Sequence, residues 1–225
     1  MDASSRRFVR CLFRMPVRVR EMDPRSADPA VLHPEEHAVV AKAVEKRKRE
    51  FAAGRLMARS LLSELGVPPD FRLLPAPHRG PAWPMEVVGS ISHTERWAAV
   101  AVASARSGVR SVGCDVEGAE DLREELWRSV CTPEEHRWLH HQPAERRGRL
   151  AKVMFSAKEC FYKLQYPLTE TFLGFHAVDV EPRDNGTFTV RLRREAGALE
   201  VGRAFEGAYA IEDGLVATGM TLARE

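Results

Sequence analysis

The chain has 225 residues, of which 44% are hydrophobic and 29% charged, a composition typical of a soluble globular protein with one large or two small domains. The 34 Lys and Arg residues nearly balance the 32 Asp and Glu residues. The formal net charge of +2 argues against an obligate nucleic-acid coat protein but permits a local basic site for an anionic ligand. No apolar run approaches the roughly 20 residues of a membrane span, so no membrane association is expected.

The cysteines are widely scattered and form no Cys-x-x-Cys pair, which argues against a zinc site. A reduced, cytoplasmic setting is therefore predicted. The four residues are Cys11, Cys114, Cys131 and Cys160.

The first half of the chain is predicted to contain one strand, a long helical stretch and two more strands. Residues 17–20 alternate like a strand. A helical stretch begins at Pro34 and runs to Leu65, with room for a break near Gly54. After a Pro- and Gly-rich loop, residues 87–103 hold two apolar runs around a polar turn, which indicates paired strands.

The second half is predicted to begin with a strand over residues 112–117. Thr132 to Glu135 form a capping box with Pro at the first helical position, so a helix begins there. A second helix is predicted over residues 147–165, and alternating runs between residues 176 and 222 indicate antiparallel strands.

This order of elements predicts two α+β halves that meet near residue 108. The N-terminal half would comprise residues 1–107 and the C-terminal half residues 108–225. No exact internal repeat is apparent in the sequence.

The segment Val112-Gly113-Cys114-Asp115-Val116-Glu117 is the most informative part of the chain. Side chains alternate across a strand, so Asp115 and Glu117 share one face. Neighbouring carboxylates repel each other unless a cation separates them, and Mg²⁺ commonly takes one or two carboxylates together with substrate phosphates. A solvated strand face with two unrelated acids is an equally good interpretation of the spacing.

A second acidic motif, Phe155-Ser156-Ala157-Lys158-Glu159-Cys160-Phe161-Tyr162-Lys163, follows a helical pattern. Glu159 and Lys163 are four residues apart and lie on one helical face. A surface Glu–Lys pair is the simpler interpretation. The functional interpretation makes Glu159 a third metal ligand or a general base, with Lys158 and Lys163 neutralising phosphate oxygens.

The two acidic motifs together resemble the paired signature of the 4′-phosphopantetheinyl transferases, in particular the larger pseudo-symmetric branch of surfactin-synthetase-activating and enterobactin-synthetase component D-like enzymes. Three further segments match the second type. They are K-R-K-R-E-F-A-A-G-R (46–55), G-P-A-W-P with G-S-I-S-H-T (80–84 and 89–94), and Y-P-L-T-E-T-F-L-G-F (166–175). The order and spacing of five segments over residues 35–180 make the resemblance specific.

The resemblance implies an α+β fold of two similar halves with the active site in the cleft between them, and it implies Mg²⁺ and coenzyme A. It assigns roles by motif position. The metal ligands would be Asp115, Glu117 and Glu159. Lys158 and Lys163 would lie at the pyrophosphate and, with Glu159, make up the catalytic group. Coenzyme A would be contacted by Arg47, Arg55 and His93, with Arg79 and Ser92 in the nucleotide-contacting loops.

The implied reaction is attack of a carrier-protein serine hydroxyl on the β-phosphate of coenzyme A, with adenosine 3′,5′-bisphosphate as the leaving group. Acyl, peptidyl or aryl carrier proteins of polyketide, nonribosomal-peptide and siderophore synthesis would be the partners. A monomer is expected because one chain supplies both halves of the cleft. Four apolar residues after the catalytic helix either receive the carrier or belong to the core. They are Pro167, Leu168, Phe172 and Leu173.

Other interpretations stay open at this point. The basic stretch 46–59 also suits a solvated helix face or a phosphate-binding surface for nucleic acid, although it lacks interleaved aromatic residues. His93, taken alone, fits an ordinary turn residue, and His136 with His140 fits a solvated helix face. The competing functions are another magnesium-dependent enzyme, such as a phosphohydrolase, and a non-catalytic homologue that binds coenzyme A or a carrier.

Overall fold

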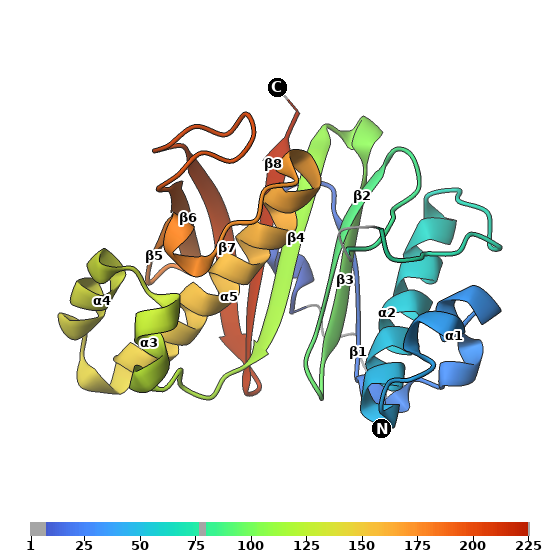
Figure 1. The fold of residues 1–225 in the computed structure, drawn as a ribbon, viewed down its shortest axis with the longest axis horizontal. Helices are drawn as coiled ribbons and strands as arrows, with labels where there is room; N and C mark the ends of the chain where they lie inside the picture. Colours follow the sequence, from blue (N-terminus) through green and yellow to red (C-terminus); the bar gives the residue numbers. More distant parts are fainter. Residues whose placement is uncertain (1–7, 77–79, 225) are drawn as a thin grey trace.

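The computed structural model describes residues 8–76 and 80–224, and it contains two antiparallel sheets flanked by helices. The two sheets lie side by side in the middle of the molecule, with α1 and α2 outside one and α3 to α5 outside the other (Figure 1). The helices are α1 (Pro34–Val40), α2 (Glu45–Glu64), α3 (Glu124–Val130), α4 (Pro133–His140) and α5 (Ala144–Thr169). The strands are β1 (Arg18–Met22), β2 (Val87–His93), β3 (Ala98–Ser104), β4 (Val109–Gly118), β5 (Val178–Pro182), β6 (Thr187–Leu192), β7 (Ala204–Glu212) and β8 (Leu215–Ala223).

The first sheet has the order β1-β3-β2, and α2 packs against it. The two strands predicted over residues 87–103 are β2 and β3, and they pair with His93 opposite Ala98. The helical stretch predicted from Pro34 to Leu65 is two helices, and the break lies at residues 41–44 rather than at Gly54. Gly54 is inside α2, where an added Cβ would lie 3.2 Å from Ile91 Cγ2, so the glycine lets α2 approach β2 closely.

The second sheet has the order β4-β8-β7-β6-β5, and α5 lies across β4 and β8 (Figure 1). The capping box at Thr132 is present: its side chain accepts from the Glu135 amide at 3.2 Å, and Glu135 accepts from the Thr132 amide at 2.7 Å. Helix α5 is longer than predicted, running to Thr169 and including Pro167. Helix α3 was not predicted at all.

Gly113 of β4 lies directly against the backbone of α5. A Cβ added there would lie 2.2 Å from the carbonyl oxygen of Cys160, which is backbone and cannot rotate away. We therefore expect Gly113→Ala to lower the free energy of unfolding by about 1–3 kcal/mol, the usual cost of overpacking. Urea unfolding measures the change. Gly174→Ala is the control, because a Cβ there meets nothing within 4 Å; equal stability of the two variants would contradict the packing argument.

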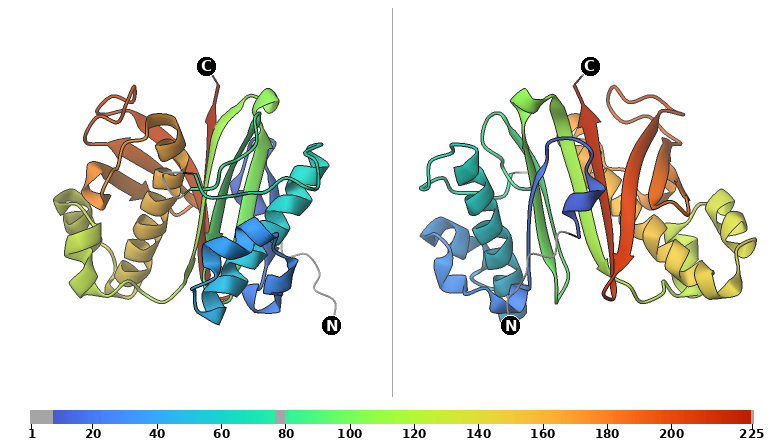
Figure 2. Two further views of the ribbon diagram at one scale, coloured as in Figure 1. Left: turned by 45° about the vertical axis from the view of Figure 1, so that its right-hand side comes forward. Right: turned by 180° about the vertical axis from the view of Figure 1, so that it is seen from behind.

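The two halves share a continuous hydrophobic core where the sheets meet. β4 contacts β2 and β3 of the first sheet. The buried residues of this cluster come from the N-terminal segment, β3, β4 and β8, and they are Phe8, Val9, Leu12, Val17, Ala99, Ala101, Ala103, Val109, Val112, Cys114, Val116 and Ala217. Seen from behind, the N-terminal segment crosses in front of the junction of the two sheets (Figure 2). The N-terminal segment therefore helps to hold the two sheets together.

The two halves share a short exact repeat, which corrects the expectation from the sequence that none is present. Pro-Glu-Glu-His begins α1 at Pro34 and α4 at Pro133. In the first half, Glu36 accepts from the His33 amide at 3.1 Å, the Leu73 amide at 3.2 Å and the Arg59 guanidinium of α2 at 2.9 Å.

The second half repeats this arrangement around Glu135. Its carboxylate accepts from the Thr132 amide at 2.7 Å, the Val180 amide at 2.6 Å and the Lys158 ammonium of α5 at 2.6 Å. Glu36 and Glu135 are both buried. A buried glutamate and a cation thus join α1 to α2 in the first half and α4 to α5 in the second, and Lys158 occupies the place that Arg59 has in the first half.

Candidate active site

Asp115 of β4 is the centre of a buried polar cluster at the junction of the two halves. Its Oδ1 accepts from Ser92 Oγ at 2.8 Å and Lys163 Nζ at 2.7 Å, and its Oδ2 accepts from Ser156 Oγ at 2.8 Å. Only 2% of Asp115 is exposed. A buried carboxylate requires such donors because burial without them is costly. Three elements, β2, β4 and α5, therefore meet at one carboxylate.

Ser92 connects the first half to this cluster. Its hydroxyl donates to Asp115 and accepts from the Val116 amide at 3.2 Å and from Lys163 Nζ at 2.9 Å. Ser90, two residues earlier on β2, accepts from the Cys114 amide at 3.1 Å. Because alternate residues of a strand share a face, these two serines fix the position of β2 beside β4.

Lys163 lies on the face of α5 that points to this junction. Burial is the largest single influence and opposes the charged form of Lys163, but Asp115, Cys114 and Glu159 together outweigh burial and raise the pKa of Lys163. The Lys163 side chain is 26% exposed, and the raised pKa keeps its ammonium charged at neutral pH. It can neutralise an anionic ligand without first breaking its contact to Asp115, because an ammonium has three donors.

Glu117 and Glu159 lie around the same charge cluster. Burial, followed by repulsion from Asp115, raises the pKa of Glu117 to about 7, and Glu159 adds to this shift. Burial and Asp115 also raise the pKa of Glu159. Lys152 Nζ lies 4.0 Å from Glu117 Oε2 and opposes the shift of Glu117. The predicted metal residues are therefore close enough to repel one another.

This set of oxygen donors fits a hard divalent cation such as Mg²⁺. Among the residues with described positions, no three His, Cys, Asp or Glu side chains form a ready-made metal-binding group. Mg²⁺ does not require one, because it usually takes one or two carboxylates and completes its coordination with water and substrate phosphates. The raised pKa values of Glu117 and Glu159 reflect carboxylates that a cation would stabilise.

His93 and Arg47 form a second polar group on the first-half side. Nη1 of Arg47 contacts Nε2 of His93, whose Nδ1 lies 3.3 Å from Glu50 Oε2. Burial, followed by the charge of Arg47, lowers the pKa of His93 to about 4. The ring is thus neutral at pH 7, with Arg47 donating to it. Glu50 was not predicted as part of this group.

Arg55 of α2 is buried with 6% of its surface exposed, and its guanidinium lies 3.9 Å from the centre of the Phe51 ring. Its Nε has no hydrogen-bond partner among the residues that the structure describes. Burial lowers the pKa of Arg55 to about 10, and the negative charge of Glu36 only partly offsets this shift. A buried cation with an unpaired donor is suited to an anionic ligand. The predicted nucleotide contact Arg79 lies outside the described residues.

Lys158 does not reach this site. Its ammonium is buried in the second half, where it donates to Glu135 Oε2 at 2.6 Å and to the carbonyl oxygens of Val130 and Phe175, both at 2.8 Å. All three donors are used, so an approach to a pyrophosphate would break three buried bonds. The physical reason is helical spacing: Lys163 is five positions after Lys158, which puts the two side chains about 140° apart around α5.

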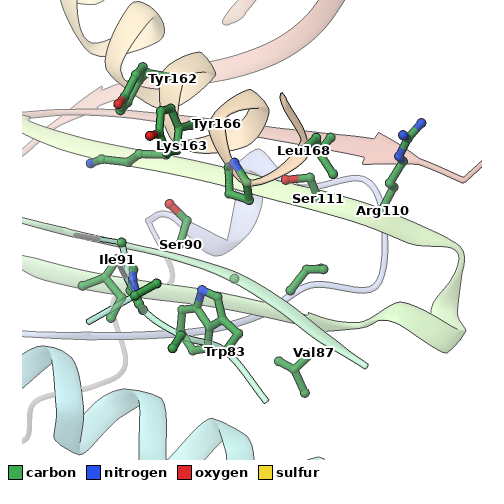
Figure 3. Close-up of a pocket in the computed structure, with 17 residues that line it drawn as sticks. Trp83, Val87, Ser90, Ile91, Arg110, Ser111, Tyr162, Lys163, Tyr166 and Leu168 are labelled. Atoms are coloured by element: carbon green, nitrogen blue, oxygen red, sulfur yellow. The ribbon is translucent and has the colours of Figure 1, made fainter. Parts of the chain in front are cut away.

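A cavity of about 430 Å³ opens beside this cluster, between the two halves. Figure 3 shows Tyr162, Lys163 and Tyr166 of α5 on one side and Trp83, Val87 and Ile91 of the first half on the other. Gly89 also lines the cavity, and it lets the Trp83 ring pack close to β2, because an added Cβ would lie 2.7 Å from that ring. The cavity is mainly apolar, with Lys163 toward one end and Arg110 toward the other (Figure 3), which fits a long ligand with an anionic group.

Sequence reasoning assigned no role to several of these residues. Ser156, Glu159 and Lys163 are spaced i, i+3 and i+7, so the helical period alone places Ser156 on the face that carries the site. Tyr162 and Tyr166, with ring centres 5.1 Å apart, are likewise four residues apart. The positions of Trp83 and Glu50 in the site could not be predicted from sequence periodicity, because tertiary contacts bring them there.

Comparison with known proteins identifies the family. Residues 35–103 match the 4′-phosphopantetheinyl transferase N-terminal domain, and residues 111–212 match the 4′-phosphopantetheinyl transferase superfamily. The chain is 41% identical over 200 residues to 4′-phosphopantetheinyl transferase Svp from Streptomyces mobaraensis, covering 86% of this chain and 80% of that protein. It is 37% identical over 203 residues to 4′-phosphopantetheinyl transferase Npt from Nocardia iowensis, covering 85% and 89%.

A more distant relative is enterobactin synthase component D from Escherichia coli strain K12, with 32% identity over 165 residues that cover 68% of this chain and 75% of that protein. The predicted fold class agrees with these matches and with the two antiparallel sheets and their helices. The predicted family is thereby confirmed: the chain belongs to the 4′-phosphopantetheinyl transferases.

Proposed function

We propose that this protein transfers phosphopantetheine from coenzyme A to a serine of an acyl, peptidyl or aryl carrier protein and releases adenosine 3′,5′-bisphosphate. One observation supports this proposal above the others. Asp115, Lys163 and Ser92 form a buried charged cluster at the end of a cavity between the two halves, and Glu159 lies within electrostatic range of it. Phosphoryl-group transfer depends on such positioning and charge neutralisation.

Coenzyme A is proposed to bind in the cavity and to contact both the Asp115 cluster and the group formed by His93 and the α2 arginines. The apolar cavity suits the pantetheine arm, and Lys163 at its edge suits the pyrophosphate. The arginines of α2, Arg47 and Arg55, suit the remaining phosphate with His93 beside them. His93 is neutral at pH 7 and its Nε2 accepts from Arg47, so it would orient Arg47 toward the phosphate rather than supply a charge.

Asp115, Glu117 and Glu159 are the proposed residues for holding Mg²⁺, which when bound would offset the negative charge of the pyrophosphate. The protein's own groups supply the remaining steps. Glu159 accepts the proton of the carrier serine, directly or through a bound water. Lys163 stabilises the charge that develops on the pyrophosphate oxygens. The α2 cations hold the leaving group so that the reacting phosphorus stays in line with the serine.

The intact mass of an apo carrier protein tests this proposal. The carrier is incubated with the protein, coenzyme A and Mg²⁺, with EDTA as the control. A gain of one phosphopantetheine that EDTA prevents supports both the reaction and the metal requirement. Release of free phosphate without modification of the carrier would instead indicate a phosphohydrolase, and coenzyme A binding without either product would indicate a non-catalytic homologue.

Arg55 offers a test of coenzyme A binding that separates function from stability. Arg55→Met removes a buried, incompletely paired cation, so the free energy of unfolding is expected to stay equal or rise. The loss of charged hydrogen bonds to phosphate is expected to weaken coenzyme A binding by about 10–100-fold. Calorimetric titration and urea unfolding give the two quantities. Arg106→Met, an exposed arginine paired with Glu86, is the control; unchanged affinity in Arg55→Met would remove Arg55 from the site.

Carriers of nonribosomal-peptide, polyketide and siderophore synthesis are the proposed partners, since the relatives of this chain include an enterobactin synthase component. Nucleic acid is not proposed as a partner, because the basic residues of α2 are engaged in the site or in ion pairs. The structure contains no helix, within the ranges it describes, that is long and apolar enough to cross a membrane. The monomeric state and the cytoplasmic location stay predictions.

A further inference from the structure

Lys158 joins three segments of the second half at one point. Its ammonium donates to Val130 O at the end of α3, to Glu135 in the first turn of α4 and to Phe175 O in the segment after α5. Only 1% of its side chain is exposed. Its neighbour in the chain is Glu159. Of these contacts, the bond to Phe175 holds a loop that returns along α5 toward the site.

This loop, residues 170–175, forms one wall of a cavity of about 220 Å³ next to Glu159. Phe172 is 73% exposed, and its ring packs edge-to-face against Tyr162 with ring centres 5.9 Å apart. At the other end of the loop, the Phe175 ring lies 5.5 Å from the Phe155 ring. Gln165 Nε2 donates to Thr171 O at 3.1 Å and holds the near end. Lys158 holds the far end through the Phe175 carbonyl.

Two cavities therefore meet along the same helix. The larger one lies on the Lys163 side between the two halves, and the smaller one lies on the Glu159 side within the second half. Tyr162 lines both. In phosphoryl transfer the attacking and leaving oxygens lie roughly in line on opposite sides of phosphorus. If coenzyme A fills the larger cavity, the acceptor serine has to arrive from the side of the smaller one.

We propose that Lys158 is a positioning residue for the carrier protein: its buried contacts hold the loop 170–175 in place, so that the smaller cavity beside Glu159 can receive an apolar side chain of the carrier next to the acceptor serine. This inference rests on the proposed function. The exposed Phe172 at the rim supplies apolar contact area that the fold itself does not use.

The first half supplies a matched control for testing Lys158. Arg59 donates to Glu36 as Lys158 donates to Glu135, and each glutamate also accepts from two backbone amides. Lys158→Met and Arg59→Met each leave one buried glutamate without its cation. Both are expected to lower the melting temperature, because an uncompensated buried charge is destabilising. Only the Lys158 variant changes the wall beside Glu159.

The experiment measures KM for the carrier, KM for coenzyme A and kcat, with the melting temperature of each variant. Lys158→Met is expected to raise the carrier KM at least fivefold while KM for coenzyme A changes less than twofold. Arg59→Met is expected to leave the carrier KM within twofold of wild type. An unchanged carrier KM in a folded Lys158→Met protein, or an equal rise in Arg59→Met, would overturn the proposal.

Phe172→Ala decides the matter if Lys158→Met does not fold, because a residue that is 73% exposed can be truncated without loss of the core. It is expected to raise the carrier KM at least threefold, and an unchanged value would refute the assignment of this cavity to the carrier. A wild-type protein that modifies no carrier would defeat the proposed function itself. Normal wild-type transfer with an unaltered carrier KM in both variants would defeat only this inference.

Discussion

Replacing Glu159 with glutamine is expected to reduce kcat by about 10²–10⁴-fold, the usual contribution of a general base. Glutamine keeps the shape of the side chain but cannot accept the serine proton. The substitution also removes one of the carboxylates that repel Asp115, so the fold should lose little stability. Single-turnover transfer at saturating coenzyme A and carrier measures the rate, and urea unfolding checks the stability.

The pH dependence distinguishes a base from a residue that only shapes the site. A general base works in its deprotonated form, so the wild-type rate should fall as pH drops through the pKa of Glu159. Burial, followed by repulsion from Asp115, raises this pKa in the metal-free protein. A bound cation would lower it, so the acidic limb should move to lower pH as the Mg²⁺ concentration increases. The acidic limb attributable to Glu159 should be absent from the residual activity of the glutamine variant. Glu145→Gln, an exposed glutamate in the first turn of α5, is the control; near-normal turnover in Glu159→Gln would remove Glu159 as the base.

The local parts of this structure could be predicted from the sequence. The alternation in residues 112–117 placed Asp115 and Glu117 on one face of β4, with Val112, Cys114 and Val116 buried on the other. The capping box at Thr132 located the start of α4 correctly. Both signals depend on residues within one turn or one strand, where backbone geometry alone relates side chains.

The contacts between halves could not be predicted in this way. Ser92 and Asp115 are joined by a hydrogen bond that depends on how β2 lies beside β4, and no periodicity in either strand encodes that register. The family resemblance placed both residues near coenzyme A or metal but did not indicate that they touch. Arg55 likewise fitted a solvated basic face, whereas in the folded protein it is buried.

Lys158 illustrates how a motif can mislead about direction. Lys158 and Lys163 occur in one short segment, and a shared role at the pyrophosphate was predicted for both. The helical period separates them by about 140°, so only one of them can face the cleft. The repeated Pro-Glu-Glu-His segments could have indicated the role of Lys158. Each segment supplies a buried glutamate that pairs with a cation from the long helix of its own half.

Asp115→Asn is expected to have the second large effect, because Asp115 supports both the fold and the proposed metal site. The substitution leaves the partly buried Lys163 without its carboxylate partner, at an expected cost of at most about 3 kcal/mol. It also removes one charged oxygen donor for Mg²⁺, so transfer should fall by about 100-fold or more and require higher Mg²⁺ concentrations.

A double variant separates these two roles. In Asp115→Asn/Lys163→Met neither charge is left unpaired, so urea unfolding should show stability regained relative to Asp115→Asn. Transfer should not recover, because both the carboxylate and the ammonium have been removed from the proposed site. Mg²⁺ titrations of the rate at fixed coenzyme A compare wild type with Asp115→Asn. If the single variant kept its rate and its Mg²⁺ dependence, Asp115 would be a structural residue and the metal would have to be held by Glu117 and Glu159 without it.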